Sequence, residues 1–455
     1  MNPFSGIFID EGLSHTQTIE RYRQRRLEVA QKLGHITVIG GTQTPPGGKN
    51  SWVHLPTFIY QEPLMLFLTG INQLKTALIL DPQGPIKEIL FITPKNTVME
   101  FWEGKRFGVG DEDSLEEVRF MTGIHEVQDL ANLDAYLAQR LSQTQETLGL
   151  YWHQGEKKAL KEDNWAFKTQ LASKLKRSKI KNPIINIEPQ MWDLRFPLDE
   201  YDFKNSQIAQ DKTREAFLET LKKIKTCQSE TEVAGFLNGQ IQQRSYFGNS
   251  FPSIIASGLN ATVLHYTKNN DPLVKDGLLL MDFGVRWQSM HADVSRTVPV
   301  SGKFNPLQSL LYTIVLEAQA LFESMVQPGA ILDDLNSQCW DYINAQLKQR
   351  FIDQGGTMKL AYAKAPHNIS HLIGMQVHDG DPFRSYKKQP LKAGMMISNE
   401  PGIYGHFAID INGIHYNESI GIRIEDDLWV TASGCLNLSH QCPKSIADIE
   451  KLMAD

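Results

Sequence analysis

Residues 278–297 constrain the fold of this chain more than any other segment, because they place two aspartates in an apolar setting. Asp282 follows four consecutive apolar residues, and Asp293 lies eleven residues later. A hairpin with Trp287-Gln288 as its two-residue loop would set Asp282 directly opposite Asp293, with Cβ atoms about 4.5–5.5 Å apart. Two carboxylates at that distance repel each other unless a cation lies between them. The segment therefore predicts a divalent-cation site, against the alternative of two solvent-facing aspartates on an edge hairpin.

Two glutamates are further candidate ligands. Arg423 and Glu425 alternate with isoleucines, so they share one face of a predicted strand. Glu400 ends an apolar run and precedes Pro401, which stops regular strand pairing and leaves the glutamate at a strand tip. Each residue also has an ordinary interpretation: a buried ion pair with Arg423 for Glu425, and a surface turn for Glu400.

Three histidines, His367, His371 and His378, lie within twelve residues, and Asp379 follows the last of them. The spacing of the first two also occurs in HExxH zinc helices, but no glutamate follows His367 and residues 368–370 are poor helix formers. We interpret the segment as a loop that enters a strand. One histidine here would ordinarily be a core residue, whereas the cluster favours chemistry. Four carboxylates and a histidine that hold two divalent cations could activate water at neutral pH, which indicates a two-metal hydrolase.

Composition narrows the class of protein. A chain of 455 residues predicts two or three domains, and 41% hydrophobic and 22% charged residues are ordinary for a soluble protein. The net charge of −6 argues against nucleic acid as a partner. We interpret the basic run 174–181 as a solvated helix face or linker, because no aromatic residues interleave it. The chain shows no apolar stretch of about 20 residues and no signal peptide at its start, so we expect no membrane partner and a cytoplasmic protein.

The cysteines carry no visible motif. They lie far apart, at Cys227, Cys339, Cys435 and Cys442. Without CxxC spacing they argue against a structural zinc site and against a disulfide framework.

Strand and helix patterns predict two domains. In the first, an α/β layer, we expect strands at 36–39, 64–68, 77–80, 88–92 and 147–151 and helices at 18–33, 114–119 and 128–142. The basic run and Pro183 place the boundary between residues 180 and 181, which gives domains of residues 1–180 and 181–455. In the second domain we expect strands and hairpins, with helices at 204–226, 306–326 and 332–351.

Six motifs in residues 250–430 together resemble aminopeptidase P and, more broadly, the proline-peptidase/creatinase group with its "pita-bread" fold. They are Leu264-His265-Tyr-Thr, Met281-Asp282-Phe-Gly, Ala292-Asp293-Val-Ser-Arg-Thr, His367-x-x-x-His371-x-x-Gly-x-x-x-His378-Asp379, Glu400-Pro-Gly-x-Tyr404 and Arg423-Ile-Glu425-Asp. Residues 67–72 and 101–108 resemble the N-terminal domain of the same family more weakly. The resemblance implies a creatinase-like α/β N-terminal domain followed by an α+β pita-bread catalytic domain. Two changes beside the ligands depart from the common pattern: Phe283 stands where the family has Ala, and Ser295 where it has Thr.

The resemblance also implies an activity and a ligand set. Peptides that begin Xaa-Pro would be the substrates, and cleavage would release the first residue. Asp282 would bind one metal ion, His371 and Glu400 the other, and Asp293 and Glu425 would bridge both. A hydroxide shared by the two ions would attack the scissile carbonyl, with Glu400 as the proton acceptor.

Other motif residues would surround this centre. By the resemblance, His265 and His378 would donate hydrogen bonds to the developing oxyanion, and His367 would shape the pocket for proline. Tyr404 and Arg423 would hold the ligands in place. One imidazole and four carboxylates form a hard, oxygen-rich site, which favours two Mn²⁺, with Co²⁺ or Zn²⁺ as alternatives.

The resemblance does not fix the number of subunits or the length of the peptide substrate. It implies a homodimer or homotetramer, in which Trp102 would reach an active site of its own or of a neighbouring subunit. The alternative within hydrolases is a prolidase, which cleaves only Xaa-Pro dipeptides, because the motifs do not show how far the cleft extends beyond proline. The alternative outside enzymes is a non-catalytic binding protein on the same fold, although such proteins typically lose ligands that this chain retains.

Overall fold

The computed structural model describes residues 12–43, 61–151, 164–380 and 384–454. The chain forms two compact units, one that ends at Phe196 and one made of residues 197–380 and 384–455. The division comes later than residue 180, because β6 (Ile184–Asn186) pairs with β5 (Leu148–Tyr151) and so extends the sheet of the N-terminal unit.

The N-terminal unit is built on a six-stranded mixed sheet with the strand order β4-β3-β2-β1-β5-β6. Besides β5 and β6, its strands are β1 (Ile36–Gly40), β2 (Thr76–Leu80), β3 (Glu88–Ile92) and β4 (Val127–Asp129). The pairs β1–β2 and β2–β3 are antiparallel, whereas β1–β5, β3–β4 and β5–β6 are parallel. Strands β1 and β2 are buried along their whole length, as their continuous apolar runs predict.

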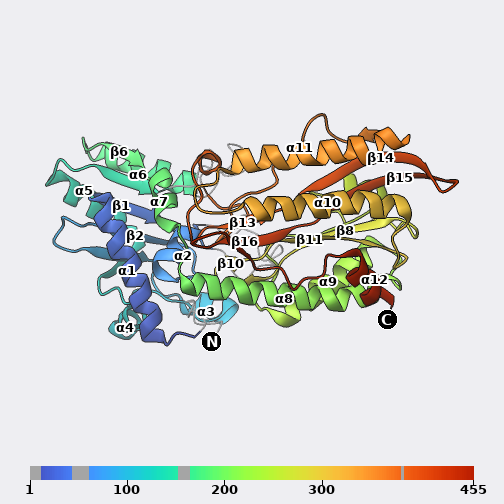
Figure 1. Ribbon diagram of the computed structural model, residues 1–455. Helices are drawn as coiled ribbons and strands as arrows, with labels where there is room; N and C mark the ends of the chain where they lie inside the picture. Colours follow the sequence, from blue (N-terminus) through green and yellow to red (C-terminus); the bar gives the residue numbers. More distant parts are fainter. Residues whose placement is uncertain (1–11, 44–60, 152–163, 381–383, 455) are drawn as a thin grey trace. The chain divides into compact units, whose positions relative to one another are not determined.

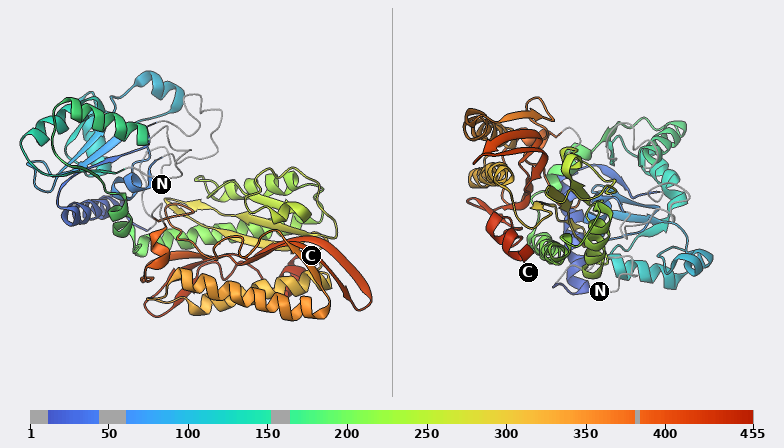
Figure 2. Two further views of the ribbon diagram at one scale, coloured as in Figure 1. Left: turned by 90° about the horizontal axis from the view of Figure 1, so that it is seen from above. Right: turned by 90° about the vertical axis from the view of Figure 1, so that its right-hand side faces the viewer.

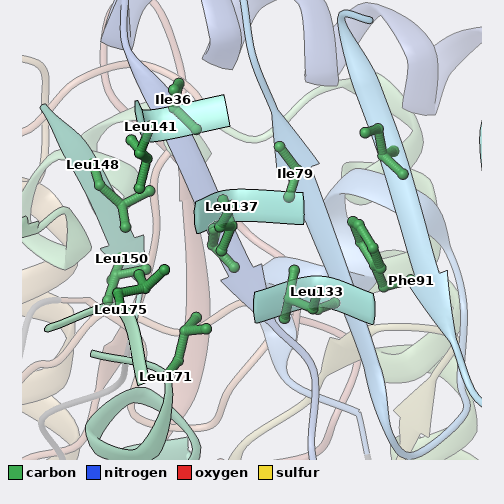
Figure 3. Close-up of a cluster of buried hydrophobic side chains, with 13 residues drawn as sticks. Ile36, Ile79, Phe91, Leu133, Leu137, Leu141, Leu148, Leu150, Leu171 and Leu175 are labelled. Carbon is green, nitrogen blue, oxygen red and sulfur yellow. The ribbon is translucent and has the colours of Figure 1, made fainter. Parts of the chain in front are cut away.

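One face of this sheet packs against α5 (Leu133–Ser142) and α6 (Asn164–Arg177), as Figure 3 shows. Leucines 133, 137 and 141 recur every four residues, so they form a single stripe on α5 that faces the sheet. The lysines and the arginine of the basic run 174–181 are exposed, and Lys174 pairs with Asp134; its interpretation as a solvated face or linker stays a prediction. Three further helices of the described part of this unit are α3 (Thr97–Glu103), α4 (Glu112–Thr122) and α7 (Glu188–Arg195).

Helices α1 (His15–Leu33) and α2 (Pro63–Thr69) pack against each other, and the second corrects a prediction. The strand expected at 64–68 is wrong, because these residues lie in α2. Every residue of that run is buried on all sides. A short apolar run of this kind is compatible with a buried helix as well as with a buried strand, so the pattern alone could not distinguish the two. Pro63 in the first turn and Gly70 in the left-handed conformation (φ 67°) mark the two helix ends.

The C-terminal unit contains three small antiparallel sheets and one short hairpin. The sheets are formed by β11 (Val294–Pro299), β8 (Leu278–Phe283) and β7 (Ile254–Ser257); by β12 (Thr357–Leu360), β14 (Gly402–Ile411) and β15 (Ile414–Arg423); and by β13 (Met396–Asn399), β16 (Asp426–Val430) and β17 (Cys435–Asn437). The hairpin pairs β9 (Arg286–Trp287) with β10 (Met290–His291). Strand β15 contacts β8 and β11, so the first two sheets lie together.

Two helix pairs enclose these strands (Figures 1 and 2). On one side lie α10 (Pro306–Met325) and α11 (Leu332–Arg350), with α10 in contact with β13, β14 and β15. On the other lie α8 (Glu200–Ile224) and α9 (Glu230–Arg244), with α8 in contact with β9, β10 and α12 (Ile446–Ala454). The helices predicted near 204–226, 306–326 and 332–351 are confirmed as α8, α10 and α11.

All four cysteines are free thiols, in agreement with the absence of a disulfide motif. None of the helices that the structure describes has both the length and the apolar character needed to cross a bilayer.

Candidate active site

The β8–β11 hairpin brings Asp282 and Asp293 to one face, in a register that differs from the expected one. The loop is Gln288-Ser289, since Met290 pairs with Trp287, and Asp282 therefore lies opposite Ser295. Direct opposition of the two aspartates was a wrong prediction. Ser295 and Asp293 are two residues apart on their strand, so Asp293 is a diagonal neighbour of Asp282 on the same face.

Glycine at position 284 allows the hairpin to close. A Cβ atom on Gly284 would lie 1.8 Å from the carbonyl oxygen of Ala292. That distance is a severe steric clash, so only glycine fits at this position. The backbone N–H of the residue after Ala292, Asp293, donates a hydrogen bond of 3.0 Å to Asp427 Oδ2, which is buried. These contacts fix the backbone that carries the Asp293 carboxylate.

Arg423, Ser295 and Glu425 form a buried hydrogen-bond chain beside the aspartates. Arg423 Nη2 donates to Asp282 Oδ2 at 2.6 Å, and its Nε donates to Ser295 Oγ at 2.8 Å. The Ser295 hydroxyl in turn donates to Glu425 Oε2 at 2.8 Å. The ion pair that was considered between Arg423 and Glu425 is therefore formed with Asp282 instead. Ser295 links Arg423 to Glu425 through two hydrogen bonds.

Backbone pairing between residues 369–373 and β13 places His371 beside Glu400. The amide of Ser398 donates to the His371 carbonyl at 2.9 Å, and that of Glu400 donates to the Ile369 carbonyl at 2.8 Å. His371 Nδ1 lies 3.0 Å from the Leu372 carbonyl, an acceptor, so Nδ1 carries the ring proton. The lone pair on Nε2 then faces the site, 3.5 Å from Glu400 Oε1 and 3.7 Å from Asp293 Oδ2.

These side chains share one cavity of about 190 Å³. It is lined by Leu264, His265, Asp282, Asp293, His367, Asn368, Ser370, His371, His378, Arg384, Tyr386, Lys387, Glu400, Arg423 and Glu425. One ligand atom from each of three buried residues, Asp293, His371 and Glu425, lies within 4.8 Å of the other two. Of the ten distinct candidate positions, Tyr404 alone is missing from the lining, and it lies behind His367 and Arg423.

The carboxylates of the cavity are held in an environment that opposes their ionisation. Burial, with Glu425 and Asp282 close by, raises the pKa of Asp293 well above its usual range. Burial and the neighbouring Glu400 do the same to the pKa of Glu425. Burial also raises the pKa of Glu400, to about 8. Burial and the nearby His378 lower the pKa of His371 well below its usual range.

The donor set fits divalent cations. Buried carboxylates this close together repel one another when they are ionised. A metal ion between them would compensate that repulsion. Asp282 Oδ1 is buried without a hydrogen-bond partner in the described part of the chain, which leaves it free as a ligand atom. The neutral His371 offers its Nε2 lone pair to the same space.

His367 is fixed from behind by Tyr404 and Arg423. Its Nδ1 lies 2.8 Å from the Asn368 carbonyl and therefore carries the proton, so Nε2 accepts from the Tyr404 hydroxyl at 3.0 Å. Tyr404 Oη accepts in turn from Arg423 Nη1 at 3.2 Å. Burial and the nearby Arg423 lower the pKa of His367 to about 4, so the ring is neutral at neutral pH.

His265 and His378 are the exposed imidazoles of the cavity. Their ring centroids lie 6.4 Å apart, and that of His378 lies 4.3 Å from the ring of His371. Trp102 belongs to the N-terminal unit, where its side chain is 75% exposed. His406 and His415 are exposed on β14 and β15.

The structure gives a role to Ser295, a residue of the motifs, and adds three residues that lie outside the motifs. Ser295 could have been found from strand alternation, because it shares a face with Asp293. Arg384, Tyr386 and Lys387 line the cavity without any sequence signal. They lie in the chain between the candidate ligands His371 and Glu400, in and beside the short 3-10 turn Ser385–Lys388.

Comparison with known proteins decides the family. A model of the metallopeptidase family M24 matches residues 204–432, half of the chain, and a model of the aminopeptidase P N-terminal domain matches residues 22–150. The chain belongs to metallopeptidase family M24. Among M24 relatives, it is 30% identical to Xaa-Pro aminopeptidase 3 of Mus musculus over 407 residues, 88% of this chain and 77% of that one. It is 28% identical to the Xaa-Pro aminopeptidase of Haemophilus influenzae, over 86% of this chain and 88% of that one.

Solved structures of the M24 family agree. An aminopeptidase P structure from Bacillus anthracis superimposes with a TM-score of 0.81 at 27% identity, over 96% of this chain and 98% of that one. The Escherichia coli aminopeptidase P with the inhibitor Pro-Leu superimposes with a TM-score of 0.79 at 23% identity, over the same shares, and supports the fold. The expected α/β class, an aminopeptidase P-like N-terminal domain with a C-terminal pita-bread domain, is confirmed. The chain is a metallo-aminopeptidase.

Proposed function

We propose that this chain is a two-metal Xaa-Pro aminopeptidase, which releases the first residue from peptides that have proline in second position. The observation that carries the proposal is the convergence of Asp293, His371 and Glu425, whose ligand atoms lie within 4.8 Å of one another. Asp282 and Glu400 line the same cavity. The names of the relatives support the choice of substrate.

Asp282, Asp293, His371, Glu400 and Glu425 would together hold the two metal ions. When bound, the ions supply a water of lowered pKa as the nucleophile and polarise the scissile carbonyl. Four carboxylates and one imidazole favour Mn²⁺, because hard cations of this size prefer oxygen ligands. The Arg423–Ser295–Glu425 chain orients two of the ligands, since Arg423 also bonds Asp282.

Glu400 moves the proton. It stands at the end of β13 and lines the cavity, with Oε2 3.7 Å from His367 Nδ1. In this position it can take the proton that the attacking water loses and give it to the departing proline nitrogen. The amide nitrogen of proline leaves only when it is protonated, so a carboxyl group that both accepts and returns the proton serves both halves of the reaction.

The histidines bind the substrate. His265 and His378 face the cavity from two segments, and an N–H from each can donate to the carbonyl oxygen as negative charge develops on it. His367 is neutral and its Nε2 is occupied by Tyr404, so its ring presents an apolar surface suited to the proline ring. Trp340 is buried and packs edge to face against the His367 ring, with the two ring centroids 5.9 Å apart.

Specificity for proline has a physical reason. Proline lacks a backbone N–H and has a fixed φ, so a peptidase that binds substrates as strands loses a hydrogen bond there. A cavity built around the proline ring avoids this loss. A homodimer or homotetramer, with Trp102 near an active site, stays a prediction.

The test is cleavage by metal-free protein to which Mn²⁺ is returned. The substrates are an Xaa-Pro-Xaa tripeptide, the Xaa-Pro dipeptide and an Xaa-Ala-Xaa tripeptide. We expect Mn²⁺-dependent release of the first residue from the proline tripeptide and little turnover of the alanine peptide. Turnover of the dipeptide alone would establish a prolidase instead, and turnover of none would favour the binding protein. Asp282→Asn should abolish activity, whereas Asp410→Asn, an exposed carboxylate on β14, should not.

A further inference from the structure

The segment between Ser257 and Leu273 carries His265 to the cavity wall. It contains one short 3-10 turn, Gly258–Thr262, and is otherwise irregular. The His265 side chain is exposed, and the described residues offer its imidazole no hydrogen bond. The position of the ring therefore depends on how the backbone of this segment is held.

A single buried carboxylate, that of Glu230, bonds four donors of this segment. Glu230 is the first residue of α9 and is fully buried. Its Oε1 accepts from the Ser257 amide at 2.8 Å and from Asn260 Nδ2 at 3.0 Å. Its Oε2 accepts from the Tyr266 hydroxyl at 2.8 Å and from the Asp271 amide at 3.0 Å. One side chain thus holds both ends of the segment and its middle.

The charge of Glu230 is compensated without a cation. None of the described lysines or arginines pairs with it. Four N–H and O–H donors and the N-terminus of α9 surround the carboxylate instead. An amide in its place would offer one acceptor oxygen, and its NH₂ group would face donors. A glutamine therefore keeps the shape of the side chain but cannot accept all four bonds.

The anchored segment contacts the core of the site. Tyr266, the residue after His265, packs in a buried cluster with Ala261, Leu280 and Tyr404. Tyr404 is the residue that donates to His367. The bond from Tyr266 to Glu230 thus fixes the residue next to His265 against the wall of the same cavity.

We propose that Glu230 is a positioning residue for His265, which it holds by bonding the segment 257–271 at four points. The inference rests on the proposed function, in which His265 donates to the developing oxyanion. Glu230 does not line the cavity. Its loss should therefore lower kcat and leave KM nearly unchanged, because the misplaced donor acts only as charge develops.

The first test measures anchoring without reference to activity. Amide hydrogen exchange is compared among the metal-loaded wild type, Glu230→Gln and Glu232→Gln, the last a control at an exposed carboxylate in the same helical turn. We expect at least one of the Ser257 and Asp271 amides, which bond different oxygens of Glu230, to exchange at least about tenfold faster in Glu230→Gln only, because glutamine has a single acceptor oxygen and leaves one of them without an acceptor. Wild-type exchange in that variant would overturn the inference. Tyr266→Phe, which removes one hydroxyl, tests the same point should Glu230→Gln fail to fold.

The second test is a double-mutant cycle with His265. Glu230→Gln and Tyr266→Phe should each lower kcat about tenfold in the wild type, with KM changed less than about twofold. In a His265→Ala background they should cause no further loss, since the group they position is gone. A further tenfold loss there would show a general structural role and overturn the inference.

The outcomes separate this inference from the proposed function. Wild-type kcat in His265→Ala would remove the role of His265, and with it the inference. If the wild-type protein cleaves no peptide, the proposed function fails, and the exchange result alone decides whether Glu230 holds the segment.

Discussion

Replacing Ser295 by alanine tests the proposed ligand support in the most specific way. The Ser295 hydroxyl is fully buried, accepts from Arg423 Nε at 2.8 Å and donates to Glu425 Oε2 at 2.8 Å. A hydrogen bond to a charged group contributes about 1.5–3 kcal/mol. If the bond to Glu425 orients a ligand, its loss should weaken metal binding by about 10- to 100-fold, at 1.4 kcal/mol per tenfold.

Metal affinity is the appropriate assay, because it separates ligand orientation from catalysis. Mn²⁺ is titrated into metal-free wild type, Ser295→Ala and Ser295→Thr in competition with a chelator of known affinity. Threonine keeps the hydroxyl, so this variant should bind Mn²⁺ within a few-fold of wild type. Equal affinity of Ser295→Ala and wild type would refute the reasoning, as would an equal loss in both variants.

Three other predictions follow from the cavity. Glu400→Gln should fold normally, as judged by circular dichroism, but lose at least about 10²-fold in kcat; near wild-type turnover would remove its role as proton acceptor. In the metal-free protein the pKa of Glu400 is about 8, against about 4.3 unfolded, so the folded state retains a proton that the unfolded state releases. Stability should therefore fall as pH rises from about 4.5 to 8, and urea midpoints at pH 5 and 8 in chelator check this, with a higher midpoint at pH 8 counting against it. Tyr404→Phe removes the donor to His367, so kcat/KM for the proline tripeptide should fall about 2- to 10-fold, and an unchanged value would separate Tyr404 from substrate binding.

The convergence of Asp282 and Asp293 on one face was predictable from sequence, although the register used to derive it was not. The hairpin exists, but its loop lies one residue later than expected, which displaces the strand register by two residues. Gln288 adopts a positive φ of 55° in that loop, where a glycine or asparagine would have signalled the turn. A displacement of two residues leaves each side chain on its original face, so Asp282 and Asp293 still share one.

Local sequence patterns could not predict the secondary structure where a helix and a strand would bury the same residues. The run 64–68 is wholly buried in α2, and only Pro63 and Gly70 distinguish it from a strand. The network Arg423–Ser295–Glu425 joins strands more than 120 residues apart in the chain. Strand alternation shows which side chains share a face, but which residue bonds which depends on how the sheets pack.

The number and place of the metal ions test the central claim most directly. Crystals of the wild-type protein grown with Mn²⁺ should show anomalous scattering at two positions in the cavity. The account predicts one peak next to Asp282, the other next to His371 and Glu400, and Asp293 and Glu425 between them. A single peak, or none at full Mn²⁺ saturation, would contradict the two-metal mechanism.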